Sequence, residues 1–360
     1  MKKTVLAIAC IGALAVSGCK KDKKVTTTPP VDFTTLEGQV LTDFSNKLVN
    51  PDYQDIKAKA GLLNDAVAAF AASRTDDNLT AMRIAWKNTR QPWELCEGFL
   101  FGPVEDNSYD PTIDDWPVNK NDLENLLKSN NPLTVADIDA LPTSSKGFHA
   151  IEYIIFGEGG KNAASINDRQ LLFLTSLTQS LYNTTKELAD SWDPAVGNYT
   201  AEVINAGKGS TSYTSRKLVF DALVGSMAGI CDEVANGKMA DAMAISGDST
   251  KAESRYSHNS TTDFTNNIKG ILNAYQSSYN GVGGHSLKEM VSVKNASLDK
   301  TLTDQMNDAI NAFSTLSGYT FEEAVYSHRT QVAAVQAKIN VLKKTLEVDL
   351  GDFVTNNVKD

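Results

Sequence analysis

The sequence predicts an all-α protein built as two four-helix-bundle-like halves that pack together. Three observations lead to this prediction. From Val31 onward, apolar residues recur mostly at three- and four-residue steps, the spacing that places them on one face of a helix. No segment has the alternating pattern of a β-strand. A Gly-, Asn- and Thr-rich break at 193–214 separates two sets of long helical segments, giving a first bundle at 31–193 and a second at 194–360.

The N-terminal signal and tether are predicted to lie outside the fold. Two lysines precede a short apolar run, so residues 1–18 resemble a signal peptide. The Val-Ser-Gly-Cys sequence at 16–19 resembles a bacterial lipobox, which implies cleavage before Cys19 and lipidation of this cysteine. Residues 19–30 are charged, Thr-rich and Pro-ended, as in a flexible tether. We expect a lipid-anchored protein of the cell envelope, held to a membrane through Cys19; plain secretion is the alternative.

Apolar periodicity predicts the long helices of the first half. They cover 31–48, 53–72, 78–101 and 168–192. Asn50-Pro51 is expected to end the first helix, and Pro92 to bend or split the third. The segment 104–143 is rich in Pro, Asp and Asn, and is predicted to be irregular apart from short helices at 120–128 and 135–141. A connection of this length inside a compact domain is usually functional.

The second half is predicted to hold four further helices, at 215–237, 260–279, 297–316 and 320–355. Ser260-Thr261-Thr262-Asp263 resembles a capping box at the start of the second of these. Cys96 and Cys231 are the cysteines left in the mature fold. These two cysteines could form one disulfide, but we expect them to be two small buried side chains.

A short helix between Gly147 and Gly157 carries the clearest candidate site. His149 and Glu152 are three residues apart and therefore share a helix face. All other residues between the two glycines are apolar or aromatic, which is typical of a buried helix. A buried imidazole and carboxylate need compensating groups. A hydrogen-bond network or a metal ion would supply them.

A second helix repeats this pattern. Glu94 and Glu97 are also three residues apart and lie among apolar residues, and Arg90 is placed to pair with Glu94. Asp114, in the long connection, is a further candidate ligand. Facing carboxylates with one imidazole suit iron, manganese or zinc, and oxygen-only ligation suits calcium. A purely structural network without metal remains the alternative.

The remaining sequence features give less support for a functional site. Glu253, Ser254 and Arg255 open a dense polar stretch that, taken alone, predicts a solvated loop before a helix. The net charge of −10 argues against nucleic acid as a partner. The motif at His149 is half of an inverted zinc-peptidase motif, but Tyr153 stands where the second histidine is required.

Several stretches together resemble the imelysin family. They are GFHAIEYIIFG at 147–157, with its Gly-x-His-x-x-Glu motif, WELCEGFLFGP at 93–103, IDDWP at 113–117 and ESRYSHNS at 253–260. The resemblance implies two helical bundles with the motif residues near their interface, and an envelope protein linked to iron uptake. It implies that His149 and Glu152 form the signature pair, with Glu94, Glu97 and Asp114 as candidate metal ligands. Glu253 and Arg255 would face this site from the second half, and Ser254 and Arg90 would line it.

Three functions follow for comparison. The first is a lipid-anchored protein that binds iron, or an iron-bearing partner such as an iron-transport component, between the bundles. The second is a scaffold whose polar cluster locks the halves together without metal. The third is a metallopeptidase, which the resemblance also implies; with one histidine, zinc ligation would be unusually rich in carboxylates. We favour them in this order, so enzymatic activity is left open and is not the expectation.

Overall fold

The structure is a computed structural model and describes residues 32–359. These residues lie in one compact unit, Asp32–Asp360. The described chain is helical and contains no β-strand, only an isolated bridge between Tyr279 and Val282. The all-α prediction is therefore confirmed. The predicted signal peptide, the tether and Cys19 fall outside the described residues. No helix within residues 32–359 is long and apolar enough to cross a membrane.

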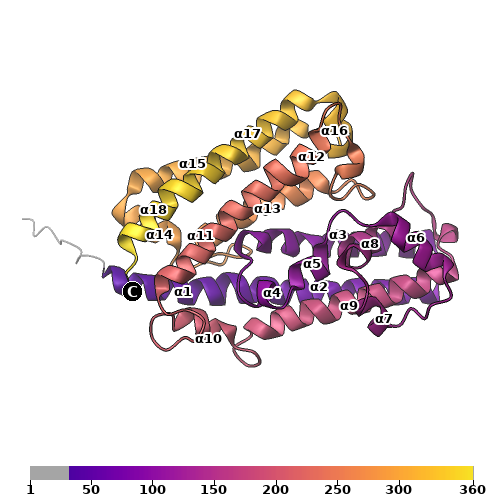
Figure 1. The fold of residues 1–360 in the computed structure, drawn as a ribbon, viewed down its shortest axis with the longest axis horizontal. Helices are drawn as coiled ribbons and strands as arrows, with labels where there is room; N and C mark the ends of the chain where they lie inside the picture. The colour runs from indigo at the N-terminus through magenta and orange to yellow at the C-terminus, as the bar shows by residue number, and fades with distance from the viewer. Residues whose placement is uncertain (1–31, 360) are drawn as a thin grey trace, which may run out of the picture. The chain divides into compact units, whose positions relative to one another are not determined.

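The long helices of the first half are α1 (Phe33–Asp43), α2 (Asn50–Ala72), α3 (Asp76–Cys96) and α9 (Asp168–Trp192). Helix α2 packs along both α3 and α9 (Figure 1). Capping residues fix where α3 and α9 begin: the side chains of Thr75 and Asn167 accept backbone N–H groups of the first turn. Helix α3 continues through Pro92 without splitting.

The predicted break at Asn50-Pro51 is wrong. A π-helical turn, η1 (Phe44–Val49), joins α1 to α2, and Pro51 lies in the first turn of α2. The ladder of main-chain hydrogen bonds is already irregular at the π turn, and the N–H that proline lacks falls at this irregularity. The Asn50 side chain donates to the Ser45 carbonyl at 2.9 Å and so satisfies an acceptor in the π turn.

The long connection is more ordered than the sequence predicts. Its helices are α4 (Pro103–Asp106), α5 (Tyr109–Asp114), α6 (Lys120–Lys128) and α7 (Val135–Asp139), and the 3-10 turn η3 (Thr143–Ser145) ends it. The 3-10 turn η2 (Glu97–Phe99) precedes it, directly after α3. Helix α8 (Gly147–Ile155) and the 3-10 turn η4 (Ala163–Ser165) follow. The two predicted short helices are found. Asp114 is the last residue of α5, and Glu97 begins a 3-10 turn because α3 ends at Cys96.

The second half contains α10 (Tyr199–Ile204), α11 (Arg216–Asp232), α12 (Met239–Met243), α13 (Ser260–Gln276), α14 (Leu287–Lys294), α15 (Ala296–Ala312), α16 (Phe321–Ser327), α17 (Arg329–Thr345) and α18 (Gly351–Asn357). π turns η5 (Glu233–Lys238) and η8 (Leu346–Leu350), and 3-10 turns η6 (Ser249–Lys251) and η7 (Phe313–Leu316), extend or link them. Helices α11, α13, α15 and α17 pack against one another (Figure 1). The single helix predicted at 320–355 is wrong, because His328 leaves helical geometry and separates α16 from α17.

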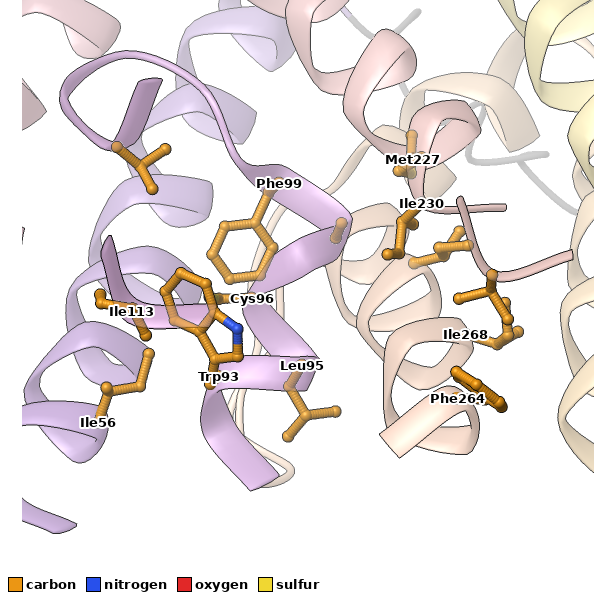
Figure 2. Close-up of a cluster of buried hydrophobic side chains, with 14 of the residues drawn as sticks. Ile56, Trp93, Leu95, Cys96, Phe99, Ile113, Met227, Ile230, Phe264 and Ile268 are labelled. Carbon is orange, nitrogen blue, oxygen red and sulfur yellow. The ribbon is translucent and has the colours of Figure 1, made fainter. Parts of the chain in front are cut away.

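The two halves meet where α3 and η2 pack on α13. A Cβ at Gly270 would clash with the Leu95 carbonyl, and a Cβ at Gly98 would lie 2.7 Å from the Gly270 carbonyl carbon. Two glycines therefore allow direct backbone contact at this crossing. Figure 2 shows the segment with Trp93 and Phe99 between side chains of the first half and those of α11 and α13. Cys96 and Cys231 are buried free thiols, as expected.

Candidate functional site

Helix α8 is held against the end of α5 by its first residue. Gly147 has φ +70°, and a Cβ there would clash with the carbonyl oxygen of Ile113. Only glycine adopts this backbone at low cost in such a space. The contact places His149 beside Asp114, the residue that follows Ile113.

His149 lies between two carboxylates and is almost completely buried. Its Nδ1 is 3.2 Å from Glu152 Oε2, and its Nε2 is 3.1 Å from Asp114 Oδ1. Burial alone would lower the pKa of His149, but the contacts with Asp114 and Glu152 raise it to about 9.

Glu152 connects this helix to the second half. Its Oε1 accepts the backbone N–H groups of Tyr256 at 3.1 Å and Ser257 at 2.8 Å. One carboxylate therefore orients the imidazole with one oxygen and fixes the loop before α13 with the other. A carboxylate on the second ring nitrogen is the usual support of a metal-binding histidine.

Arg90 occupies the centre of the cluster and is fully buried. Its guanidinium contacts Glu94 and Asp114, and lies 3.2 Å from Glu253 Oε1 and 3.4 Å from Asp263 Oδ1. Burial alone would lower the pKa of Arg90, but these carboxylates raise it well above its usual value. A buried guanidinium of this kind stays charged and is stable only because it is paired.

Asp114 receives three contacts from residues of the first half. The Trp93 indole donates to its Oδ2 at 2.7 Å, while Arg90 and His149 contact Oδ1. Burial alone would raise the pKa of Asp114, but Arg90 and His149 hold it well below its usual range. These contacts therefore favour the anionic form of Asp114 in the interior.

The second half supplies Glu253, Ser254, Lys238 and Asp263. Lys238 Nζ lies 2.7 Å from Glu253 Oε1, and Ser254 donates to Asp263 Oδ2 at 2.5 Å. Burial raises the pKa of Asp263 to about 6, although Arg90 opposes the change. The two halves therefore share one charge network.

Glu94 and Glu97 form its edge toward η2. The Asn267 amide contacts both carboxylates, at 2.7 Å from Glu94 Oε2. Burial raises the pKa of both groups well above the usual carboxylate value. By contacting both carboxylates, the Asn267 amide stabilises the two neighbouring acids when both are charged and also when they share a proton.

Three side chains are placed to hold a cation. One ligand atom each from Asp114, His149 and Glu253 lie within 4.8 Å of one another. Among the described residues, His149 Nε2 and Glu253 Oε2 are buried without an aligned hydrogen bond, although Nε2 lies 3.1 Å from Asp114 Oδ1. Unsatisfied buried polar atoms are costly and indicate a missing ligand or water.

Most candidate residues from the sequence converge here. Arg90, Glu94, Asp114, His149, Glu152, Glu253 and Ser254 join one network, and Glu97 borders it through Asn267. Arg255 does not join it: its guanidinium pairs with Glu158 at 2.6 Å and is partly exposed. Glu253 is a better-placed ligand than Glu97, because one of its carboxylate oxygens lies within 4.8 Å of ligand atoms of Asp114 and His149.

Sequence reasoning missed Lys238, Asn267 and the role of Asp263. The expected capping box is wrong: Asn259 is the N-cap residue, and the Asp263 side chain turns toward Arg90 and Ser254. The available signal was spacing, because Asp263 and Asn267 share a helix face four residues apart. Lys238 is brought inward by the π turn η5, which has no clear sequence pattern.

The fold and the site define a helical protein with a buried histidine–carboxylate–arginine cluster between two bundles. A model of the imelysin family, peptidase family M75, matches residues 49–348, so the chain belongs to the imelysin family. It is 26% identical over 353 residues to "Iron-regulated protein A" of Synechococcus elongatus, covering 96% of this chain and 92% of that protein.

Two crystal structures share the fold. One is described as an iron-regulated protein A precursor from Parabacteroides distasonis, with a TM-score of 0.82 and 24% identity over 93% of this chain and 97% of that one. The other is an imelysin-like protein from Psychrobacter arcticum, with a TM-score of 0.72 and 16% identity over 88% of this chain and 95% of that one.

Proposed function

We propose that this protein binds an iron ion as cargo at Asp114, His149 and Glu253, and serves iron uptake in the cell envelope. The observation that carries the proposal is the convergence of Asp114, His149 and Glu253, in which His149 Nε2 and Glu253 Oε2 are buried without an aligned hydrogen bond. One imidazole with two carboxylates suits iron. The name of the Synechococcus relative, an iron-regulated protein, supports iron as the metal.

The surrounding residues fit this role. Glu152 on Nδ1 orients the imidazole so that Nε2 lies on the side of Asp114, where the ion would bind. Lys238 and Arg90 hold Glu253 through Oε1, which leaves its Oε2 without a hydrogen-bond partner. Binding requires a neutral imidazole, and the ion would therefore displace a proton from His149.

The test is the iron content of purified protein after anaerobic incubation with Fe²⁺ and dialysis. We expect about one iron per chain in the wild type, loss of iron in Glu253→Gln, and an affinity about 10–100-fold weaker in Glu152→Gln. His285→Ala is the control, because His285 pairs with Glu289 at 2.8 Å outside the cluster. A wild type without bound iron contradicts the proposal.

A metal-free scaffold is the second candidate, and Arg90 favours it. The guanidinium already lies among four carboxylates, so part of the negative charge is neutralised without an ion. The scaffold predicts that Glu253→Gln lowers the stability of the protein while iron never binds. Measuring both properties on the same variants separates the two candidates.

A metallopeptidase is the weakest candidate. His149 is 1% exposed and Glu253 is 1% exposed, so a peptide bond has no open path to the cluster. Catalytic metal sites keep an open position for water or substrate. Hydrolysis of a denatured protein, abolished in His149→Ala, would revive this candidate.

We also propose that residues 1–18 are removed and that a lipid on Cys19 anchors the protein to an envelope membrane. This rests on the lipobox-like segment at 16–19. Mass spectrometry of the mature N-terminus should find a lipid on Cys19, and Cys19→Ser should move the protein to the soluble fraction. Iron-transport components of the envelope are the partners that we expect, and cross-linking in iron-limited cells would identify them.

A further inference from the structure

An acidic cleft lies beside the buried cluster. It has a volume of about 600 Å³ and is bounded by residues 97–111 on one side and by α11 on the other. Four of its lining residues are acidic: Glu97, Glu105, Asp110 and Glu233. No Lys, Arg or His of the described chain lines it. Carboxylates gathered in a cleft with low-dielectric walls concentrate cations.

Glu97 lies on the wall that the cleft shares with the buried cluster. Its side chain is 5% exposed, and it lines the cleft. Asn267 contacts Oε2, while no described residue makes a hydrogen bond or ion pair to Oε1. The Glu97 carboxylate therefore forms part of the cleft wall and is held by Asn267 from the side of the cluster.

Two side chains separate the cleft from the proposed iron ligands. Lys238 lies 2.9 Å from Glu233 on the cleft wall and 2.7 Å from Glu253 in the cluster. Asn267 bridges Glu97 and Glu94 in the same way. Lys238 reaches both acids because η5 is π-helical and places Glu233 and Lys238, five residues apart, on one face.

We propose that this cleft is the entry route by which a hydrated divalent cation reaches Asp114, His149 and Glu253. The proposal rests on the proposed function, because it assigns the access path to that same site. The acids of the cleft would collect the cation, and Lys238 stands at the point where it must pass inward.

The cleft also has room that a substitution can fill. Gly225 and Gly229 of α11 line it, and a Cβ built on either glycine meets no atom within 4 Å. Leucine at position 229 would project into the cleft without disturbing the backbone. Gly229→Ala gives the same gain in helix propensity with little added volume, and is the matched control.

The experiment measures the rate at which Fe²⁺ enters the full chain. Protein and Fe²⁺ are mixed anaerobically, free iron is trapped with ferrozine after set delays, and the protein-held fraction is plotted against time. We expect Glu105→Gln/Glu233→Gln to load at least ~10-fold more slowly at low salt, with unchanged final iron content. Asp304→Asn/Asp308→Asn on α15 makes the same change of charge at exposed ion pairs and should load like the wild type.

The steric variants give an independent result. Gly229→Leu should slow loading, and Gly229→Ala should not. Wild-type rates in both the double glutamine variant and Gly229→Leu overturn the entry route while leaving the proposed function intact. A wild type that holds no iron at equilibrium overturns the proposed function, and the entry route with it.

Discussion

At the scale of single residues, the stability of the cluster depends on buried charged side chains that compensate one another and that water cannot replace. Arg90 is fully buried among four carboxylates and also lies over the rings of Phe148, at 5.2 Å, and Trp86, at 5.6 Å. Removing one partner from a buried ion pair leaves the other charge without compensation. The residues around Arg90 are therefore coupled in their contribution to stability.

Arg90→Met tests this coupling. The apolar stem is kept, but the carboxylates of Glu94, Asp114, Glu253 and Asp263 lose their common cation, and we expect a loss of about 3–5 kcal/mol in the free energy of unfolding. Urea denaturation measures it. Arg74→Met is the control, since Arg74 pairs with an exposed Asp168 and should cost about 1 kcal/mol or less. Equal losses in the two variants would contradict the central role of Arg90.

Gly147→Ala tests the contact between α8 and α5. Gly159 also has a positive φ, +73°, but a Cβ there has no atom within 4 Å, so Gly159→Ala should cost only about 1–2 kcal/mol from its left-handed backbone. Gly147→Ala should cost a further ~1–3 kcal/mol through overpacking against Ile113, and should weaken iron binding by moving His149 from Asp114. Similar stability and iron affinity in both variants would contradict this prediction.

At the scale of elements, turns and caps decide what the helices present to one another. The close crossing of α3 and α13 requires Gly270 against the Leu95 carbonyl, and it brings Asn267 to Glu94. Away from the cluster, Glu202 of α10 holds the loop that leads to α11. Its Oε2 accepts the Ser210 hydroxyl at 2.7 Å and the backbone N–H groups of Thr211 and Ser212 at 2.6 and 2.9 Å.

The hydrogen bonds to the Glu202 carboxylate predict that the stability of the protein depends on pH. The hydrogen bond from Ser210 and those from Thr211 and Ser212 lower the pKa of Glu202 to about 2, below its usual 4.5. Its contribution is therefore complete above about pH 4.5 and is lost as the pH falls toward 2. The difference in urea stability between the wild type and Glu202→Gln should shrink over that range. A difference that is constant between about pH 7 and about pH 3 would contradict it.

At the scale of the whole molecule, one charge network joins both halves. Arg90 and Glu152 of the first half bind Glu253, Asp263 and the loop before α13 of the second. Together with the backbone contact at Gly270, this network should make the halves unfold together.

All four tryptophans lie before residue 193, at positions 86, 93, 116 and 192. Tryptophan fluorescence therefore reports unfolding of the first half, whereas far-UV circular dichroism reports helices in both halves. We expect the two urea transitions to coincide in the wild type, as in a two-state system. Two separate midpoints would show that the halves unfold independently.

The sequence predicts the parts of this molecule better than their contacts. Helical periodicity located the long helices, and buried polar pairs at Glu94 and His149 located the first-half side of the site. The pairing of Arg90 with Asp263 joins residues 173 positions apart, so no local sequence pattern predicts it. The helix break predicted at Pro51 is wrong because a π turn precedes this proline. The capping box predicted at Ser260–Asp263 is wrong because a buried acid at this position has the same spacing from Ser260 as the acid of a capping box.

The π turn at Glu233–Lys238 has an evolutionary consequence. A π turn holds one residue more than an α-helical turn and corresponds to a single-residue insertion. Deletion of one residue there would restore a regular α-helix and keep the two flanks in the same register. The lysine would then follow the acid by four residues, which is the spacing of an α-helical ion pair. A homologue with a one-residue gap at this point in an alignment is therefore expected to keep this acid–lysine pair on a regular α-helix.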